Sequence, residues 1–301
     1  MSTTSRRHAA ETRAFEWEVR ARAFQDRMGR VGPQPASVVS FTNRRFTVNF
    51  SAPIEHVQRL LPREIEADPI PDRPDLGLLG MCACDFWVTR IGVVPIVPIR
   101  NNDMLLRVST RFRKGGHRLR GFYTIHSTSS SFVLGTLGRH FSHFRKQRGR
   151  FERVDDRSTY SLRNARTDEL STGWVVAHTD SIDKTPPRGS CFTSIEAATD
   201  YVFRLDGSCG FDWATRRISF QPIEYPEWDL SFCQRVDYGF PLLDTLAREF
   251  ELDLSLDSTL CMQDTHQTWC ASTLYRNENA ARPWFAKRRT SESLARIGGH
   301  R

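Results

Sequence analysis

Lysine is scarce in this sequence: only four of its 43 basic residues are lysines, and the rest are arginines. Long apolar runs are absent as well, because none approaches the about 20 residues that cross a membrane as a helix. Residues 1–30 are charged throughout and hold no apolar segment of the signal-peptide kind. These absences argue against a membrane-spanning helix and an export signal. We therefore expect no membrane partner and a cytoplasmic location.

Motifs of the common enzyme classes are also missing. The sequence has no Gly-x-Ser-x-Gly turn, no phosphate loop, no dinucleotide fingerprint and no His-Glu-x-x-His pair. His140 and His143 are three residues apart and could be paired metal ligands, but nothing supplies a third ligand. The odd count of seven cysteines fits reduced thiols, and Cys82 and Cys84 are best explained as small buried side chains. We expect neither a metal nor a cofactor.

The formal net charge of +8 and the pI near 9.4 raise the question of nucleic-acid binding. The basic residues are spread along the chain, and no zinc knuckle, RNP-like strand or recognition helix is present. We therefore expect no nucleic-acid partner.

The 301 residues are enough for one large domain with a full core. A weakly amphipathic helix is expected over Glu11–Met28, followed by glycine and proline that end it. The sequence predicts a basic N-terminal helical arm over residues 1–36, a main domain over 37–282 and a basic flexible tail over 283–301.

The main domain is expected to be mostly β. Side chains alternate along a strand, so Arg107, Ser109 and Arg111 share one face, which either lines a cavity or faces solvent. Helical spacing is found over Ala52–Leu61 and over Phe132–Phe144. The middle of the domain is expected to contain four strands: Leu78–Val88, Arg90–Ile99, Met104–Arg113 and Leu119–Thr128.

Lys146 is the unusual basic residue of the main domain. An amine is nucleophilic only when it is neutral, and desolvation or nearby cations lower the pKa of a lysine. Arg145 and Arg148 flank Lys146, and on a helix His143 and Arg139 would lie on roughly the same face. This segment either carries an activated lysine or is the basic end of an ordinary helix.

Several stretches of the sequence resemble one known family. Phe41–Phe46, followed by a helix and Leu60-Leu61-Pro62, looks like the Phe-x-Asn-Arg-Glu-Tyr opening of the acetoacetate decarboxylase-like superfamily. The segment from Gly138-Arg139-His140 to Phe144-Arg145-Lys146-Gln147 is similar to its Gly-Arg-Glu…Tyr-Pro-Lys-Lys segment. Leu119–Tyr123 resembles the Arg-Gly-Val-Tyr-Phe strand of a bacterial branch of that superfamily, and Tyr225–Leu230 resembles its Pro-Pro-Trp-Pro-Leu segment.

The resemblance implies roles for individual residues. Lys146 takes the place of the Schiff-base lysine, and Arg44 that of an active-site arginine. Gln147 replaces the second lysine of the family, His140 replaces a glutamate, and the pocket carboxylate falls near Arg107. The candidate catalytic residues are Lys146, His140, His143 and His126, and the candidate substrate-binding residues are Arg44, Arg107, Arg111, Arg139 and Tyr123.

The resemblance covers roughly residues 38 to 275 and implies an α+β, mainly β fold. The family fold is an antiparallel, cone-shaped β-barrel with flanking helices, closed around a small-molecule pocket. The many short strands expected here suit such a closed sheet. Relatives form homo-oligomers, so a homo-oligomer is expected.

Three hypotheses for function remain open. In the first, the chain is a lyase that forms an imine between Lys146 and a keto acid or related carbonyl compound, with Arg44 and Arg107 holding a carboxylate. In the second, His126, His140 or His143 moves protons in an imine-independent cyclase or isomerase. In the third, the barrel binds a small molecule without catalysis. A pocket that holds Lys146, Arg44 and Arg107 together favours the first hypothesis. An apolar pocket with one histidine favours the second, and a pocket without convergent polar groups favours the third.

Overall fold

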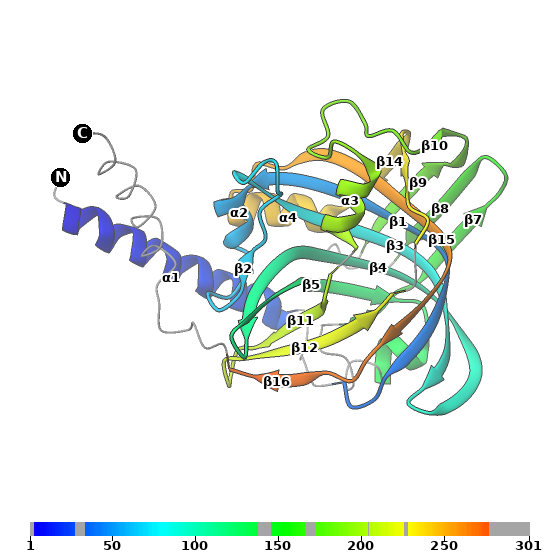
Figure 1. Ribbon diagram of the computed structural model, residues 1–301, viewed down its shortest axis with the longest axis horizontal. Coiled ribbons are helices and arrows are strands. Elements are labelled where there is room, and N and C mark those ends of the chain that lie inside the picture. The colour runs from blue at the N-terminus through cyan, green and yellow to red at the C-terminus, as the bar shows by residue number, and fades with distance from the viewer. Residues whose placement is uncertain are drawn as a thin grey trace, which may run out of the picture.

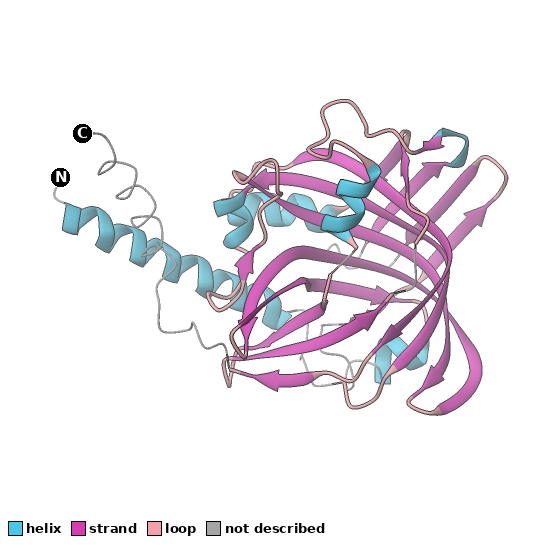
Figure 2. Cartoon of the chain, viewed as in Figure 1, coloured by secondary structure: helices cyan, strands magenta, loops and turns pink. Residues whose placement is uncertain are grey.

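The computed structural model describes residues 3–27, 34–137, 146–165, 172–203, 205–225 and 228–276. Within these ranges the chain is mainly β, with one large curved sheet, a small second sheet and few helices (Figure 2). This is the α+β, mainly β class that the sequence predicts. No helix in the described ranges has both the length and the apolar character needed to span a membrane.

The large sheet is organised around four long antiparallel strands (Figure 1). They are β15 (Ser255–Trp269), β1 (Val38–Pro53), β3 (Leu76–Ile91) and β4 (Val94–Lys114), and β5 (His117–Ser129), β11 (Gly207–Asp212) and β12 (Arg217–Glu224) follow. Ile223 of β12 pairs with Trp269 of β15, so the path of strands closes on itself. The short strands β2 (Glu66–Ala67), β6 (Lys146–Arg148), β10 (Ile182–Asp183), β13 (Ser231–Cys233) and β16 (Thr273–Tyr275) extend this sheet.

The second sheet has the strand order β14 (Val236–Gly239), β9 (Gly173–His178), β8 (Thr159–Asn164) and β7 (Phe151–Asp155). Its apolar side chains pack on one face of the large sheet, where Tyr160 stacks on Phe46 at 5.0 Å between ring centres. Aromatic stacking and the loss of exposed apolar area stabilise this contact. The small sheet therefore covers one face of the large one.

Because side chains alternate along β1, β3 and β4, the sheet that these strands form has two different faces. Phe46, Met81 and Leu106 belong to the large hydrophobic core, and we call their side of the sheet the apolar face. The opposite side, which carries Arg45 and Arg107, is called the polar face. Both arginines are buried, so the polar face is covered by other parts of the chain.

The helices are distributed between the two faces (Figure 1). The α1 (Thr3–Arg27), α2 (Ile54–Gln58) and α4 (Pro241–Phe250) helices pack on the apolar face, where Phe24 meets Phe250 edge-on at 6.0 Å. The α3 helix (Ile195–Val202) lies on the polar side, and the Ser194 hydroxyl caps it by accepting from the Ala197 N–H. Two single turns, η1 (Val133–Leu137) and η3 (Thr179–Ser181), complete the helices.

Three predicted elements differ from the structure. The candidate strand Arg90–Ile99 is wrong, because Gly92, with φ of +60°, reverses the chain and divides that stretch between β3 and β4. The helix predicted over Ala52–Leu61 is shorter, since β1 extends to Pro53. Within Phe132–Phe144 the described part ends with η1 at Leu137, and Lys146 begins a strand.

Candidate functional site

The register of β1, β3 and β4 aligns polar side chains in rows on the polar face. Arg45 pairs with Cys84, and Cys84 pairs with Asp103. Two residues further along each strand, Thr47 pairs with Cys82. Paired residues point to the same face of a sheet, so these side chains converge there. The next row consists of Asn49, Gly80 and Arg107.

Lys146 is brought to this face by β6. Its strand pairs in parallel with β5, with Lys146 opposite Ser127. The Lys146 ammonium lies 2.6 Å from Asp103 Oδ2, and the Ser127 hydroxyl donates to Asp103 Oδ1 at 2.8 Å. The side chains of Lys146 and Asp103 are only 9% and 3% exposed. This is a buried, hydrogen-bonded ion pair.

Burial is the largest influence on Asp103, and it raises the pKa of this carboxyl above the ordinary value. The Lys146 charge, the hydrogen bonds from Lys146 and Ser127, and the more distant Arg45 charge act in the opposite direction. A carboxyl with a raised pKa accepts a proton more readily. Asp103 Oδ2 is therefore suited to exchange a proton with Lys146 Nζ.

Arg45 and Arg107 lie on the same face without a carboxylate at salt-bridge distance in the described part of the chain. They are 4% and 5% exposed, and Arg45 Nε and Arg107 Nη2 lack a hydrogen-bond acceptor within those ranges. The Phe203 ring lies 5.5 Å from the Arg45 guanidinium and 5.2 Å from that of Arg107. Unsatisfied buried guanidinium groups are costly, which makes this pair a candidate anion site.

Gly80 leaves the space that Arg107 uses. A β-carbon at this position would come within 3.1 Å of Thr47 Cγ2, 3.2 Å of Asn49 Oδ1 and 3.4 Å of Arg107 Nε. The absence of a side chain at Gly80 thus lets the Arg107 guanidinium lie close to the strand.

The two cysteines of β3 lie among these groups. Cys82 Sγ is 3.6 Å from Arg45 Nη2 and 3.3 Å from the Thr47 hydroxyl. Burial alone would suppress ionisation of Cys82, but the charges of Arg107 and Arg45 outweigh it and lower the pKa of this thiol. Burial instead raises the pKa of Cys84 to about 12. The pKa values of the two thiols are therefore shifted in opposite directions although the thiols share a face.

The arginines predicted to bind substrate lie in different environments in the structure. Arg107 lies on the polar face. Arg44 forms an ion pair with Asp155 at 3.4 Å, and Arg111 forms one with Glu66 at 3.1 Å. The structure thus places Arg107 and Lys146 on the same face of the sheet and leaves Arg44 and Arg111 paired with acidic side chains.

Tyr123 and His126 belong to the apolar face. The Tyr123 hydroxyl donates to Gln25 Oε1 of α1. Between Arg107 and Leu106 the pairing of β4 with β5 shifts, so that Leu106 lies opposite His126 and Arg107 opposite Thr124. This bulge turns His126 away from Lys146. His140, His143 and Arg139 lie outside the described residues.

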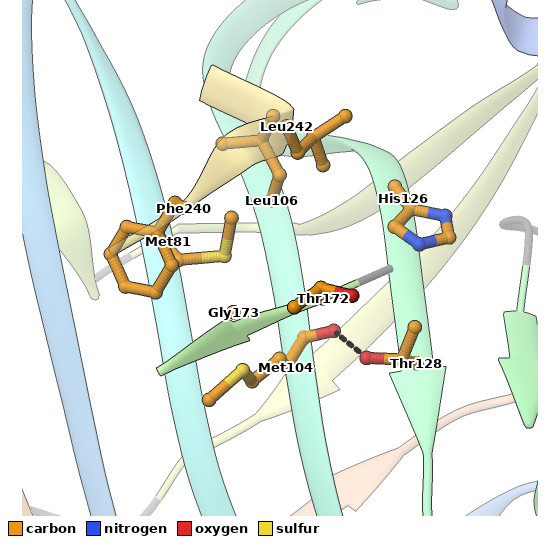
Figure 3. A pocket seen from close by; sticks show the side chains of 9 residues that line it. All are labelled: Met81, Met104, Leu106, His126, Thr128, Thr172, Gly173, Phe240 and Leu242. Carbon is orange, nitrogen blue, oxygen red and sulfur yellow. Dashed lines mark hydrogen bonds between the residues drawn. The ribbon is translucent and has the colours of Figure 1, made fainter. Parts of the chain in front are cut away.

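His126 lines a small cavity on the apolar face (Figure 3). The cavity offers about 10 Å³ of space for water centres, which is room for about one water molecule. Its other lining residues are mostly apolar: Met81, Met104, Leu106, Thr128, Thr172, Gly173, Phe240 and Leu242. An apolar pocket with a single histidine is thus present, but it is too small for a substrate.

Sequence reasoning missed Asp103 and Arg45. Alternation along the strand places Asp103 on the same face as Arg107 and Ser109, so the sequence pattern could have indicated this carboxylate. Arg45 follows directly after Arg44, and nothing in the sequence indicates which of the two is buried. Within the described ranges, no group of three or more metal-ligating side chains is found.

Comparisons with known proteins give matches among solved structures only. No protein-family model matches the chain, and no curated protein does. The acetoacetate decarboxylase of Legionella pneumophila is 12% identical, with a TM-score of 0.53 over 83% of this chain and 90% of that chain. The enduracididine biosynthesis enzyme MppR with HEPES buffer bound is 12% identical, with a TM-score of 0.51 over 82% and 97%. The same enzyme complexed with pyruvate is 11% identical, with a TM-score of 0.50 over 80% and 90%.

Proposed function

Because the chain has the acetoacetate decarboxylase-like fold, we propose that it is a lyase that forms an imine between Lys146 and a small keto acid or related carbonyl compound. The observation that carries this proposal is the buried Lys146–Asp103 pair on a face that also holds Arg45 and Arg107. It combines a nucleophile, a proton acceptor and positive charge on one face of the sheet.

The pair supplies the proton transfer that imine formation requires. Lys146 Nζ passes a proton to Asp103 Oδ2 over 2.6 Å, and the neutral amine then attacks the carbonyl carbon. The resulting carbinolamine loses its hydroxyl as water, which takes up the proton held by Asp103. The product is a protonated imine that withdraws electrons from the neighbouring carbon and so permits decarboxylation, aldol cleavage or dehydration.

The substrate class follows from the charge of the face. Arg45 and Arg107 have no acidic partner within salt-bridge distance in the described ranges, so a carboxylate on the substrate would complete the site. Pyruvate is a keto acid, and MppR has been solved in complex with it. A carboxylate-bearing carbonyl compound of this kind is the substrate class we propose.

The test is hydrogen exchange at the carbon next to the carbonyl. The protein is incubated in deuterium oxide with pyruvate or acetone, and the loss of the methyl signal is followed by proton NMR. Imine formation acidifies that carbon, so the wild type is expected to accelerate the exchange, with pyruvate preferred over acetone because of the arginines.

Two variants make the exchange experiment specific. Lys146→Met should reduce exchange to the rate in buffer, because the nucleophile is lost. Lys184→Met should exchange like the wild type, since Lys184 is half exposed and paired with Asp229 at the surface. Exchange that persists in Lys146→Met, or its absence from the folded wild type with both compounds, would contradict the proposal.

A further inference from the structure

Cys82 occupies an unusual position for a buried thiol. It is 0% exposed, and its sulfur is in hydrogen-bond contact with the Arg45 guanidinium and the Thr47 hydroxyl. Arg107 lies in the next row of the same face, opposite Gly80. The Cys82 thiol packs against the apolar parts of Cys84 and Leu105 and is at the same time within electrostatic range of two buried positive charges.

The two arginines need a counter-charge that the described carboxylates do not provide. Asp103, an acidic group of this face, is already bound to Lys146 and Ser127, and Glu66 is paired with Arg111. Two buried guanidinium groups without an anion are strongly unfavourable. A negative charge on Cys82 would relieve part of this cost, because its sulfur is in direct contact with Arg45.

We infer that Arg45 and Arg107 form an anion-binding subsite in which Cys82 is the internal counter-ion, and that Cys82 takes up a proton when a carboxylate ligand enters. The inference rests on the proposed role of the arginines in holding a substrate carboxylate and does not require imine formation at Lys146. When the ligand arrives, its negative charge replaces that of the thiolate. The sulfur then accepts a proton from solvent and remains as a neutral thiol.

Other titratable groups of the described chain lie near the subsite. Cys84 on β3 is held neutral by burial, which raises the pKa of its thiol to about 12. Burial also raises the pKa of Tyr225, which follows β12 and is within electrostatic range of both arginines, so it stays a neutral phenol. Leu260 and Met262 of β15, opposite Thr47 and Arg45, carry no charge. Among the described residues of this face, Asp103 is another group that could take up a proton, and the variants below distinguish it from Cys82.

The experiment is a calorimetric titration with propionate, a carboxylate that has no ketone for Lys146 to attack. Titrations in two buffers with different ionisation enthalpies give the number of protons taken up per bound anion. Above the pKa of Cys82 we expect an uptake approaching one proton, and an affinity that falls about tenfold per pH unit. Below that pKa the thiol is already neutral, so both effects should vanish.

Substitutions then identify the residue that takes up the proton. Cys82→Ser should abolish the proton uptake and the pH dependence of affinity, because serine stays neutral. Cys84→Ser should keep both, since that thiol is neutral in the wild type. Arg107→Met should lose propionate binding, with circular dichroism to confirm that it folds.

A second measurement uses the unmodified protein and does not depend on the folding of a variant. The ultraviolet absorbance of a thiolate should decrease when propionate is added to the wild type and recover when it is dialysed away. Absence of propionate binding, an unchanged thiolate signal, or equal proton uptake by Cys82→Ser would overturn the inference. Failure of the lysine chemistry alone would leave this result intact, so the two proposals are tested separately.

Discussion

At the scale of single residues, the account depends on the ion pair between Lys146 and Asp103. A buried pair of this kind is not a strong source of stability, because desolvation of two charges offsets most of their attraction. Removal of one partner is different, since it leaves an uncompensated charge in the interior. The contribution of the pair to stability can therefore be measured by removing one partner or both.

Lys146→Met is expected to lower the free energy of unfolding by about 3–5 kcal/mol near neutral pH, because Asp103 loses its cation. Urea denaturation measures the change. The double variant Lys146→Met/Asp103→Asn should recover much of the loss, since no buried charge remains. Lys184→Met is the matched control and should change the free energy of unfolding by about 0–1 kcal/mol, because that ion pair is exposed.

The destabilisation of Lys146→Met should depend on pH with a definite sign. Burial raises the pKa of Asp103 in the folded protein above its value in the unfolded chain. Such a carboxyl contributes stability that is fully present below the unfolded pKa, about 3.9 for aspartate, and is lost as the pH rises through the folded pKa. The deficit of the single variant should therefore shrink as the pH falls toward that range. A deficit that is independent of pH would show that Asp103 does not carry it.

At the scale of secondary structure elements, the bulge in β5 decides which side chains can meet Lys146. It lies between the pairs Arg107–Thr124 and Leu106–His126, and it directs His126 to the apolar face. Without the bulge, every side chain beyond it would change face. A local irregularity of one strand thus separates the histidine from the lysine.

His126→Gln is accordingly expected to keep the α-hydrogen exchange activity within about threefold of the wild type, because a group on the opposite face cannot relay protons to the site. The exchange assay with pyruvate measures this. A loss of activity comparable to that of Lys146→Met, in a variant with unchanged thermal stability, would show that His126 acts in the reaction.

The pairing of the strands also explains which features of the site can be predicted from the sequence and which cannot. Alternation correctly places Arg107 with Ser109 on one face, and the scarcity of lysine draws attention to Lys146. The choice between Arg44 and Arg45 could not be made, because the pairing of β1 with β3 shifts between Thr42 and Arg44. The contact of Lys146 with Asp103 depends on the pairing of β6 with β5, which joins residues far apart in sequence and has no local signal.

At the scale of the whole molecule, the fold predicted from short motifs agrees with the structure. The large sheet closes through β12 and β15. One of its faces holds the large hydrophobic core, and the other holds the polar groups together with smaller hydrophobic clusters. The N-terminal helix contributes to the core as well. Phe24 and Gln25 of α1 are 2% and 1% exposed, so the end of the predicted arm packs against the domain.

Gln25→Ala should test how far α1 is part of the folded unit. Gln25 Oε1 accepts from the Tyr123 hydroxyl and, at 3.1 Å, from Trp213 Nε1, while Gln25 Nε2 donates to the Leu60 carbonyl at 3.2 Å. Loss of these bonds should lower the free energy of unfolding by about 1–3 kcal/mol in urea. Gln34→Ala, beyond the helix, serves as a comparison at a half-buried position. Equal effects of the two substitutions would contradict a structural role of α1.

The central claim, that Lys146 forms an imine with a carbonyl substrate, is tested most directly by chemical trapping. The protein is incubated with borohydride and a panel of keto acids and ketones, and the adduct is located by mass spectrometry of its peptides. The account predicts a ligand-sized mass on the peptide that contains Lys146, its absence from Lys146→Ala, and no adduct on the peptide that contains Lys184. No adduct from any carbonyl compound on the folded wild type, or an adduct that remains in Lys146→Ala, would contradict it.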